Sequence, residues 1–553
     1  MTRRRVLALA LLLAPAAAFA QDDGDEVLRR ALATEAGQVA LVARLAPTVA
    51  AVFPGEQPGG GGGSGVVIDP RGLVLTNFHV SGLNRVLTVG LNDGRTYRAR
   101  LLGIDPGGDI ALLVLTGRAD FPAVPLGDSD AVRPGERVFA MGNPFLLAED
   151  YSPTVTQGVV SGIHRYRDAT GGSDLVYGDA IQIDASINPG NSGGPLFDAR
   201  GRLIGINGLG GFRPDRGRVN VGVGFAASIN QIKNFLLDLR AGRQCQHATM
   251  NATVRDQEDE QGRPRVVVDA ITREAKAFAA GLRLGDIVRR LDGRPVGTQN
   301  QLLTLVSRLP AGRRVTLSVA RPREDGQGFH ERDVTFRLDP LWSGPAQGEW
   351  QPDPELLAAE TRLILEAHRQ GEWPREWRRD ESIARPGGAV ERRVTHARGR
   401  LLRVERGPAD ARVVEVWDGK RGFARTPDGE GPLTPGRRDV LAGTAEALAA
   451  LAGDPEATAT LTFTGGEWLD GRAVLRLEAR DRAGRRRLLY LDPETHALAG
   501  LAYPEEKGAW VEEVHRPGVI LRLDHETGAL LEKADEVRVE PGPQASELFE
   551  RVE

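Results

Sequence analysis

From residue 66 to residue 227 the chain consists of short apolar runs separated by glycine, aspartate and proline turns. Residues 65–72 (GVVIDPRG) and 201–206 (GRLIGI) are typical of this pattern. Such regular spacing of turns indicates short strands closed into an antiparallel barrel. At the end of this stretch, Ser228 is predicted to be the N-cap of a helix over residues 229–239. The pattern therefore predicts a mainly β fold.

Ser192 lies within this stretch, in the glycine-rich segment 190–195 (GNSGGP), with apolar Leu196 and Phe197 directly after it. Acyl-transfer chemistry needs a hydroxyl exposed at a sharp bend. It also needs backbone N–H groups that point at the oxygen that becomes negative. Glycine lets the backbone fold tightly enough to aim those groups. Taken alone, the segment fits an ordinary turn equally well.

A serine hydroxyl is a poor nucleophile until a base takes its proton, and the base is usually a histidine held by a carboxylate. His79 follows the apolar run 72–75, and Asp109 opens the apolar run 110–115. The chain order of histidine, aspartate and serine is that of the chymotrypsin-type barrels and differs from subtilisin and the α/β-hydrolases. His79, Asp109 and Ser192 are therefore predicted to form a catalytic triad.

Three motifs in this order carry a resemblance to a known family: TNFHV at 76–80, DIALL at 109–113 and GNSGGP at 190–195. Further segments agree, at 140–145, 154–161 and 223–226. On these motifs, residues 46–240 resemble the HtrA/Deg family of trypsin-like serine proteases. The resemblance implies a chymotrypsin-like double β-barrel.

The resemblance also implies a role for each residue. Ser192 attacks the scissile carbonyl, His79 accepts its proton and donates it to the leaving amine, and Asp109 fixes the histidine tautomer. The backbone N–H groups of Gly190 and Ser192, with Asn191 between them, are expected to form the oxyanion hole. No metal or organic cofactor is required for this chemistry.

Three residues correspond by position to walls of the primary specificity pocket in the family: Ile187, Leu209 and Gly210. Aliphatic walls without a buried charge favour small apolar residues, such as valine or alanine, before the cleaved bond. Leu209 and Gly210 also fit a simple turn.

The triad residues have simpler explanations when each is taken alone. His79 fits a core histidine satisfied by a carbonyl, and Asp109 fits a turn cap before a strand. The three motifs together disfavour these explanations. An inactive, zymogen-like resting state stays open, because residue types do not report loop geometry.

The first 20 residues have the pattern of an export signal. Arg3, Arg4 and Arg5 are followed by the apolar run 6–13, and residues 18–20 (AFA) fit a cleavage site. We expect cleavage after Ala20 and a periplasmic or extracellular protein, with an uncleaved N-terminal anchor as the alternative. A single cysteine, Cys245, excludes an intrachain disulfide, which export permits but does not require. The formal net charge of −4 provides no global basic field for nucleic acid.

Two segments precede the barrel pattern. Residues 21–45 are acidic and then helical in character, with apolar residues near a 3.6-residue spacing over 27–41. Such a helix would cap the barrel or pack on a neighbouring subunit. Residues 59–65 hold six glycines, interrupted only by Ser64, and are expected to be a flexible connection.

Residues 248–340 resemble a PDZ domain of the bacterial protease-associated type. Strands are predicted at 265–271, 315–320 and 334–338, and a helix at 299–309. Such domains bind extended chain ends by adding a strand to a sheet edge. We assign the carboxylate-binding loop to residues 262–265 (GRPR). Pro264 removes one backbone donor there, which argues against carboxylate capture.

All seven tryptophans lie at or after Trp342, which indicates a boundary near residue 340. Residues 341–354 are predicted to be a linker, and residues 355–553 a β-rich domain with an amphipathic helix at 356–368. Short motifs in this part faintly resemble lipoprotein-sorting (LolA-like) domains, at 417–419, 469–472, 490–495 and 547–549. Those domains are curved antiparallel sheets that hold acyl chains or apolar peptides. The alternative is an accessory domain whose tryptophans form its core.

Two functions of different classes follow. The first is an exported, ATP-independent serine endopeptidase that cleaves unfolded or damaged envelope proteins, with PDZ-mediated substrate binding or regulation. For it, the family implies a homo-oligomer built from trimers. The second is a chaperone or a peptide- or lipoprotein-binding protein with minor or regulated protease activity. A lipoprotein or lipid ligand of the C-terminal domain is compatible with both.

Overall fold

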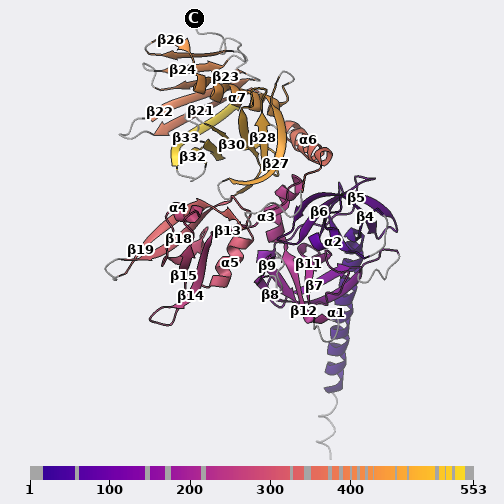
Figure 1. Ribbon diagram of the computed structural model, residues 1–553. Helices are drawn as coiled ribbons and strands as arrows, with labels where there is room; N and C mark the ends of the chain where they lie inside the picture. Colours follow the sequence, from indigo (N-terminus) through magenta and orange to yellow (C-terminus); the bar gives the residue numbers. More distant parts are fainter. Residues whose placement is uncertain are drawn as a thin grey trace, which may run out of the picture.

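The structure is a computed structural model of the chain. It describes residues 16–56, 61–143, 150–168, 176–212, 220–323, 328–341, 350–370, 376–384, 390–398, 401–407, 412–417, 421–427, 429–454, 457–469, 472–504, 510–516, 519–525 and 530–541. In Figure 1, two β-barrels and a smaller sheet unit lie side by side, and a large C-terminal sheet lies above both.

The first barrel closes in the strand order β1-β2-β3-β6-β5-β4, with antiparallel neighbours. Its elements, with the preceding helices, are α1 (Ala16–Leu45), η1 (Ala46–Thr48), β1 (Val49–Pro54), β2 (Gly63–Asp69), β3 (Leu73–Thr76), α2 (Phe78–Ser81), β4 (Val86–Leu91), β5 (Thr96–Asp105) and β6 (Ile110–Leu115). Apolar side chains such as Val89, Leu101 and Leu113 fill its interior.

The second barrel closes in the order β10-β11-β12-β9-β8-β7. Its elements are η2 (Ser129–Ala131), β7 (Arg137–Gly142), β8 (Thr154–Asp168), β9 (Val176–Ile183), β10 (Pro195–Asp198), β11 (Leu203–Phe212), β12 (Asn220–Ser228) and the following helix α3 (Ile229–Arg240). Ser228 Oγ accepts a hydrogen bond from the N–H of Gln231, so the predicted N-cap is confirmed. The predicted double β-barrel is confirmed as well.

The expectation of a flexible connection at residues 59–65 is wrong for its second half, while residues 59 and 60 lie outside the described ranges. Gly63, Ser64 and Gly65 form the start of β2 and pair with β1. A Cβ on Gly63 would lie 2.5 Å from a methyl carbon of Val80 and 2.8 Å from the carbonyl oxygen of Ser192. Glycine serves here for close approach, and β2 thereby touches the serine turn of the second barrel.

The next unit is a six-stranded sheet with the central order β14-β15-β16-β18-β19, which agrees with the predicted PDZ fold. Its elements are β13 (Ala248–Thr249), β14 (Ala252–Glu258), β15 (Pro264–Ile271), α4 (Lys276–Ala279), β16 (Ile287–Leu291), β17 (Arg294–Pro295), α5 (Gln299–Ser307), β18 (Arg314–Pro322), β19 (Phe329–Arg337) and β20 (Asp339–Pro340).

The assignment of the carboxylate-binding loop to residues 262–265 is wrong. These residues lead through the exposed tip of the hairpin between β14 and β15, where Asp259 accepts a hydrogen bond from the N–H of Arg263 at 2.9 Å. The segment that lies beside α5 is β13, whose Ala248 N–H donates to the carbonyl of Leu309 at 3.0 Å. Residues 262–265 belong to this hairpin because β14 and β15 pair with each other. The composition of the segment does not show which strands pair, so the sequence could not reveal the hairpin.

The C-terminal unit is one antiparallel sheet of thirteen strands in the order β26-β25-β24-β23-β22-β21-β33-β32-β31-β30-β29-β28-β27. Its elements are α6 (Pro354–Gln370), β21 (Glu376–Ala384), β22 (Val390–Arg398), β23 (Leu401–Arg406), β24 (Val413–Trp417), β25 (Gly422–Thr426), β26 (Gly429–Pro432), α7 (Pro435–Ala452), β27 (Thr460–Leu469), β28 (Arg472–Arg480), β29 (Arg486–Leu491), β30 (Leu498–Pro504), β31 (Trp510–Arg516), β32 (Val519–Asp524) and β33 (Leu530–Pro541).

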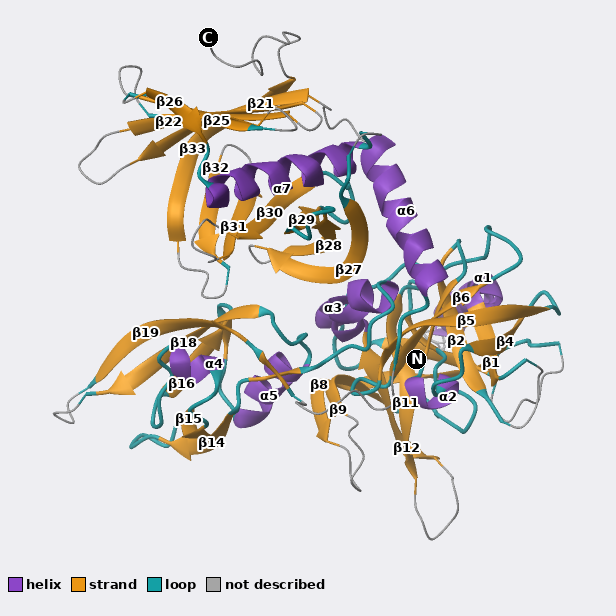
Figure 2. Cartoon of the chain, turned by 45° about the horizontal axis from the view of Figure 1, so that its top comes forward, coloured by secondary structure: helices purple, strands orange, loops and turns teal. Residues whose placement is uncertain are grey.

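Helix α7 lies against the concave face of this sheet. It joins the two edge strands, β26 and β27, so it has to cross one face, and Figure 2 shows the sheet curving around it. Its residues are buried on most sides, as expected for a helix that is apolar nearly all round. The expected curved antiparallel sheet is confirmed. Residues 547–549 and parts of the motifs at 417–419 and 469–472 lie outside the described ranges, and the LolA-like resemblance stays a prediction.

The described tryptophans do not all lie in the core of the C-terminal unit. Trp417 is buried in the cluster that packs against α7. Trp468 instead lies under the guanidinium of Arg313, which belongs to the PDZ unit, at 3.9 Å from the ring centroid. Trp342 lies outside the described ranges. The hypothesis of a purely structural tryptophan core therefore holds only for part of them.

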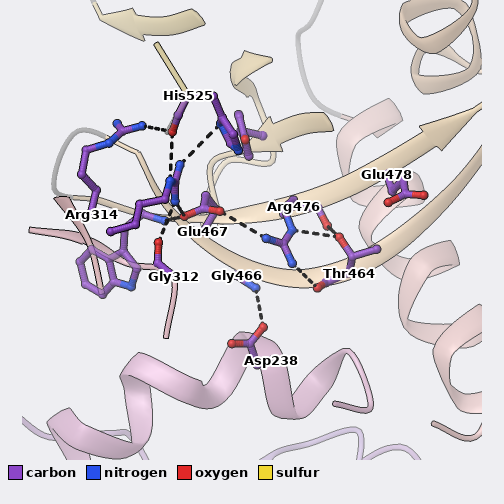
Figure 3. A network of polar contacts seen from close by, with 12 residues as sticks. Asp238, Gly312, Arg314, Thr464, Gly466, Glu467, Arg476, Glu478 and His525 are labelled. Atoms are coloured by element: carbon purple, nitrogen blue, oxygen red, sulfur yellow. Dashed lines mark hydrogen bonds and ion pairs between the residues drawn. The ribbon is translucent and has the colours of Figure 1, made fainter. Parts of the chain in front are cut away.

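A polar network near β27 joins the second barrel, the PDZ unit and the C-terminal unit (Figure 3). Asp238, near the end of α3, accepts a hydrogen bond from the N–H of Gly466 at 3.3 Å. From the PDZ unit, Arg314 binds Glu512 at 3.0 Å and Arg337 donates to the carbonyl of His525 at 3.0 Å. The C-terminal unit thus contacts both the second barrel and the PDZ unit.

Helix α1 (Ala16–Leu45) includes the predicted cleavage site between Ala20 and Gln21. The apolar core of the export signal, residues 6–13, lies outside the described part of the chain. None of the helices in the described ranges combines the length and apolarity that a membrane crossing needs. Cleavage after Ala20 stays a prediction.

Candidate active site

Asp109 directly precedes β6 and is fully buried. Its carboxylate accepts hydrogen bonds from the backbone N–H of His79 at 3.0 Å and from the Tyr177 hydroxyl at 2.8 Å. The backbone at Asp109 has φ 57°, an uncommon region for a residue other than glycine. Its carbonyl accepts from the side chain of Asn77 at 2.8 Å, which holds this conformation. Such a carboxylate is rigid and has all its partners in place.

His79 lies on the short helix α2, which directly follows β3. Its Nδ1 is 2.8 Å from Asp109 Oδ2, while the outer part of the ring is exposed. Burial lowers the pKa of His79, but the hydrogen bond and charge of Asp109 outweigh burial and leave the pKa above the ordinary 6.5. The Nδ1–H therefore donates to Asp109, and Nε2 is left to act as a base.

Ser192 lies in the turn between β9 and β10, and contacts with β2 hold this turn. The Ser64 N–H donates to the carbonyl of Ser192 at 2.8 Å, and Ser64 Oγ donates to the carbonyl of Gly190 at 2.6 Å. Gly193 has φ 84°, and a Cβ there would lie 2.2 Å from the carbonyl oxygen of Ser64. Only glycine fits this position, which explains why the turn around Ser192 needs it.

The predicted oxyanion donors differ in their partners. The N–H of Asn191 donates to the carbonyl of Asn188 at 2.9 Å, so it is not available to an oxyanion. Among the described residues, no acceptor takes the N–H of Gly190 or of Ser192. Two of the three predicted residues thus offer a backbone donor, and Asn191 separates them.

Ser192 Oγ does not yet point at the base. It donates to the carbonyl of Gly208 at 3.3 Å, and within the described residues no hydrogen bond joins it to His79. The structure therefore brings His79 and Asp109 together and places Ser192 beside them with its hydroxyl turned toward β11. A rotation of the serine side chain is needed before the proton can transfer to Nε2.

Tyr177 is a site residue that the sequence did not reveal. It is 1% exposed on β9 and lies 68 positions from Asp109, to which it donates. A Cβ at position 208 would lie 2.1 Å from the Tyr177 hydroxyl oxygen, so Gly208 makes room for it. In the sequence, Tyr177 is one residue of an apolar run in a barrel strand, and no local pattern assigns its hydroxyl to a carboxylate.

Of the predicted specificity residues, Ile187 lies between β9 and β10, and Leu209 and Gly210 lie in β11. Ile187 is 1% exposed and packs in the barrel core, where a Cβ on Gly224 of β12 would lie 2.9 Å from it. Leu209 and Gly210 are in β11 and pair with Phe225 and Gly224 of β12. The explanation of Leu209 and Gly210 as a simple turn is thereby wrong. Their role as pocket walls stays a prediction.

Two buried ionic contacts tie the barrels to the PDZ unit. His247 lies between Asp105, at 2.9 Å from Nε2, and the carbonyl of Ser307, at 2.6 Å from Nδ1. Both ring nitrogens face acceptors, which favours the cationic form of the ring. Burial lowers the pKa of His247, but Asp105 raises it above its ordinary value. Asp105 stands on the segment that leads directly to Asp109.

The second contact centres on Arg308 at the end of α5. Its guanidinium lies 3.2 Å from Asp130 and 3.0 Å from Asp179, and His164 contacts Asp179 at 2.8 Å. Asp130, His164 and Asp179 have the residue types and spacing of a metal site. Arg308 contacts both carboxylates, and Arg294 of the PDZ unit adds a second cation at 3.1 Å from Asp130, so this group connects the barrel to the PDZ unit.

Cys245 is 2% exposed and packs in the barrel core near Phe235. Burial raises the pKa of its thiol well above the ordinary value, so the thiolate needed for nucleophilic chemistry does not form near neutral pH.

Comparison with known proteins places these features in a family. Residues 63–206 match the family model of a trypsin-like peptidase domain, and residues 248–330 match that of a PDZ domain. The chain is 36% identical over 284 residues to the periplasmic serine endoprotease DegP of Escherichia coli (strain K12), which covers 48% of this chain and 58% of DegP.

Similar values hold for the serine protease PepD of Mycobacterium tuberculosis, with 34% identity over 275 residues, 47% of this chain and 58% of PepD. A solved structure of the HtrA-type protease AlgW with a tripeptide is 31% identical, covers 56% of this chain and 98% of AlgW, and has a TM-score of 0.45. The chain spans a little over half the length of the curated relatives. The part of the chain that holds the two barrels and the PDZ domain thus belongs to the HtrA/Deg family of trypsin-like serine proteases.

Proposed function

We propose that this chain is an exported serine endopeptidase that hydrolyses peptide bonds in unfolded or damaged envelope proteins without ATP. The observation that carries the proposal is the buried Asp109, which binds His79 Nδ1 at 2.8 Å beside a serine turn with two backbone donors. The family relationship and the relatives named as serine endoproteases support the same reaction.

The reaction follows from the geometry. Ser192 Oγ turns from Gly208 to His79 Nε2, loses its proton to the imidazole and attacks the substrate carbonyl. The developing oxyanion is bound by the N–H groups of Gly190 and Ser192, each worth about 3 kcal/mol of the barrier. The imidazolium, stabilised by Asp109, then protonates the leaving amine. A water activated by the same histidine hydrolyses the acyl-enzyme.

Substrate delivery is assigned to the PDZ domain. Strand β14 is an edge of its sheet. Within the described residues it pairs with β15 on one side and with no strand on the other. An extended polypeptide can add to such an edge through backbone hydrogen bonds.

Aliphatic Ile187 and the β11 residues Leu209 and Gly210 would favour cleavage after small apolar residues. Mass spectrometry of the product termini checks this preference, and cleavage after charged residues would contradict it.

The proposal includes a periplasmic location, which the relatives named as periplasmic support, and a homo-oligomer built from trimers. Helix α1 extends away from the barrels (Figure 1) and exposes the large apolar side chains of Leu28, Leu32 and Val39. Three helical positions with this spacing share a face, and an apolar stripe favours packing on another copy. Light scattering of the purified protein measures the oligomer, and a monomer would contradict the proposal.

The hydroxyl of Ser192 favours a second, weaker candidate function. The hydroxyl donates to Gly208 and not to His79, and a chaperone with regulated protease activity would show the same geometry. The two functions are separated by incubating the protein with unfolded casein and with a stable folded protein. An endopeptidase degrades casein and spares the folded control; a chaperone prevents casein aggregation and leaves it intact.

The raised pKa of His79 predicts a shifted pH dependence. The imidazole must be neutral to accept the serine proton, so kcat/KM is expected to fall as the pH drops through this pKa. Because Asp109 raises the pKa, the midpoint of the acid limb should lie above 6.5. A pH profile of kcat/KM on a peptide substrate checks this. A midpoint below 6.5 would show that Asp109 does not stabilise the imidazolium.

Tyr177 is predicted to be a positioning residue for Asp109. In Tyr177→Phe the ring keeps its buried place, and one hydrogen bond to a carboxylate is lost, which is expected to lower kcat/KM by about 10- to 100-fold. The less solvated carboxylate should attract the imidazolium more strongly and move the acid limb to higher pH. Tyr97→Phe is the control, because Tyr97 makes the same kind of bond to Asp93 at the surface. An unchanged acid limb in Tyr177→Phe would reduce Tyr177 to a packing role.

A further inference from the structure

A cavity of about 250 Å³ lies at the junction of the second barrel, the PDZ unit and the C-terminal unit. Helix α3 and the residues after it line one side, the turn between α5 and β18 lines another, and strands β27 and β28 line a third. Figure 3 shows part of this junction, with Gly312, Glu467 and Arg476 close together. The volume is below that of most pockets for drug-sized molecules, so it suits a small ligand. The catalytic triad does not line it.

The walls of this cavity carry mostly positive charge. Two carboxylates line it, those of Asp238 and Glu467, and Asp238 pairs with Arg243 at 3.1 Å. Six lysine and arginine side chains from all three units line it with them: Lys233, Arg243, Lys276, Arg313, Arg337 and Arg476. A cavity lined by more cations than anions concentrates negatively charged ligands.

The carboxylates near the arginines are shared between several of them. Glu467 lies 3.2 Å from Arg476 and 3.4 Å from Arg337. Behind the wall, Glu512 lies 3.0 Å from Arg314 and 3.8 Å from Arg337. Two carboxylates thus bind three arginines, so one positive charge in this group has no counter-charge of its own.

Arg313 is a buried cation with little compensation. Its side chain is 14% exposed, and among the described residues its guanidinium makes one hydrogen bond, to Asp292 at 3.4 Å. Burial lowers the pKa of Arg313 to about 10, and the charge of Asp292 does not offset this effect. The ring of Trp468 covers one face of the guanidinium, with its centroid 3.9 Å away. A guanidinium has five N–H donors, so most of those of Arg313 are left for a ligand.

Two ammonium groups of the wall have no carboxylate partner. Lys233 Nζ donates to the neutral carbonyl of Gly127, and within the described residues neither this group nor Lys276 Nζ forms an ion pair. Asp339 lies beside Lys276, but it accepts the backbone N–H of that residue, at 3.1 Å. Both lysine side chains are exposed and flexible, so they can turn toward an anion at the opening of the cavity.

We propose that this cavity binds phosphate, as the free ion or as the phosphate group of a small ester. A tetrahedral phosphate accepts hydrogen bonds on several sides at once, which matches cations that come from three units. Arginine binds phosphate through paired hydrogen bonds, and lysine binds it as a point charge. The bound anion connects the three units. The inference does not depend on the proposed proteolysis and is tested in a protein that lacks the catalytic serine.

The test is calorimetric titration of the full-length Ser192→Ala protein at low ionic strength with inorganic phosphate and, separately, with glycerol 3-phosphate. Saturable binding at one site per chain is expected. Tighter binding of glycerol 3-phosphate would identify the ligand as an ester, and tighter binding of inorganic phosphate would identify it as the free ion. Malonate, which carries two charges on planar carboxylates, should bind at least about tenfold more weakly. Malonate binding as tight as that of both phosphates, or no saturable binding of either phosphate, would overturn the proposal.

Two variants locate the site. Lys276→Gln removes a charge that forms no ion pair in the described chain, and Arg313→Gln removes the buried guanidinium. Each is expected to weaken phosphate binding by about tenfold. Arg255→Gln is the control, because Arg255 belongs to the same PDZ unit and pairs with Asp269 at the surface outside the cavity, at 2.8 Å. Thermal unfolding confirms that each variant is folded. Unchanged affinity in both folded test variants, or an equal loss in Arg255→Gln, would overturn the proposal.

Discussion

Replacement of Ser192 by alanine is expected to abolish peptide-bond cleavage, with kcat lowered by roughly a million-fold. The hydroxyl is the atom that forms the acyl-enzyme, and no other described side chain in the turn can replace it. Binding should survive, because the turn is held by backbone contacts to Ser64 that the substitution leaves in place. Loss of casein cleavage with retained casein binding is the expected result.

Ser318→Ala is the matched control for this experiment. Ser318 lies on β18 of the PDZ domain, and its hydroxyl donates to Asp333, far along the chain from the catalytic turn. This variant should cleave casein at the wild-type rate. Normal cleavage by Ser192→Ala would show that the serine is not the nucleophile.

Replacement of Asp109 by asparagine is expected to lower kcat by about 10⁴-fold. The new amide group would present an N–H toward His79 Nδ1 or toward the Tyr177 hydroxyl, which both donate to the carboxylate. The imidazole would then adopt the wrong tautomer, with its proton on the nitrogen that must accept the proton of Ser192. The imidazolium of the transition state would also lose its counter-charge.

This experiment separates the catalytic role of Asp109 from a role as a turn cap. Asparagine caps turns about as well as aspartate, so a structural role predicts nearly normal kcat. Asp69→Asn is the control: Asp69 caps a turn of the same barrel and binds Arg71 at 2.8 Å. A single-turnover rate is the measurement. A loss in Asp109→Asn no larger than that in Asp69→Asn would leave Asp109 without a catalytic function.

The barrels and the pairing of His79 with Asp109 could be predicted from the sequence because the signals for them are local. Short apolar runs between turns specify strands, and His79, Asp109 and Ser192 each stand in a motif at a strand boundary. The chain order then indicates which fold unites them. The N-cap at Ser228 was predictable for the same reason, since capping involves residues within one helical turn.

Contacts between segments that lie far apart in the chain could not be predicted from the sequence. The hydroxyl of Tyr177 reaches Asp109 from another barrel, and Gly208 permits this only through the absence of a side chain. Gly63 belongs to a run whose composition is that of a flexible linker, and its strand conformation follows from its packing against the serine turn. The direction of the Ser192 hydroxyl depends on a rotamer, which no residue pattern encodes.

The C-terminal unit shows the same limit of prediction from the sequence. The strand-like runs after residue 370 predicted a β-rich domain, but not that α7 would cross one face of the sheet between its two edge strands. A cavity under α7 and the junction with Asp238, Arg314 and Arg337 form where segments distant in the chain pack together. Both are properties of the packing and have no signature within a single segment.

The central claim is that Ser192 is a nucleophile that His79 activates. Labelling with a fluorophosphonate tests it most directly, because this reagent forms a covalent bond only with an activated serine. The protein is treated in the presence of unfolded casein, digested and mapped by mass spectrometry. The account predicts one modified peptide that contains Ser192, with labelling lost in His79→Ala. Absence of label on Ser192, or equal labelling in His79→Ala, would contradict it.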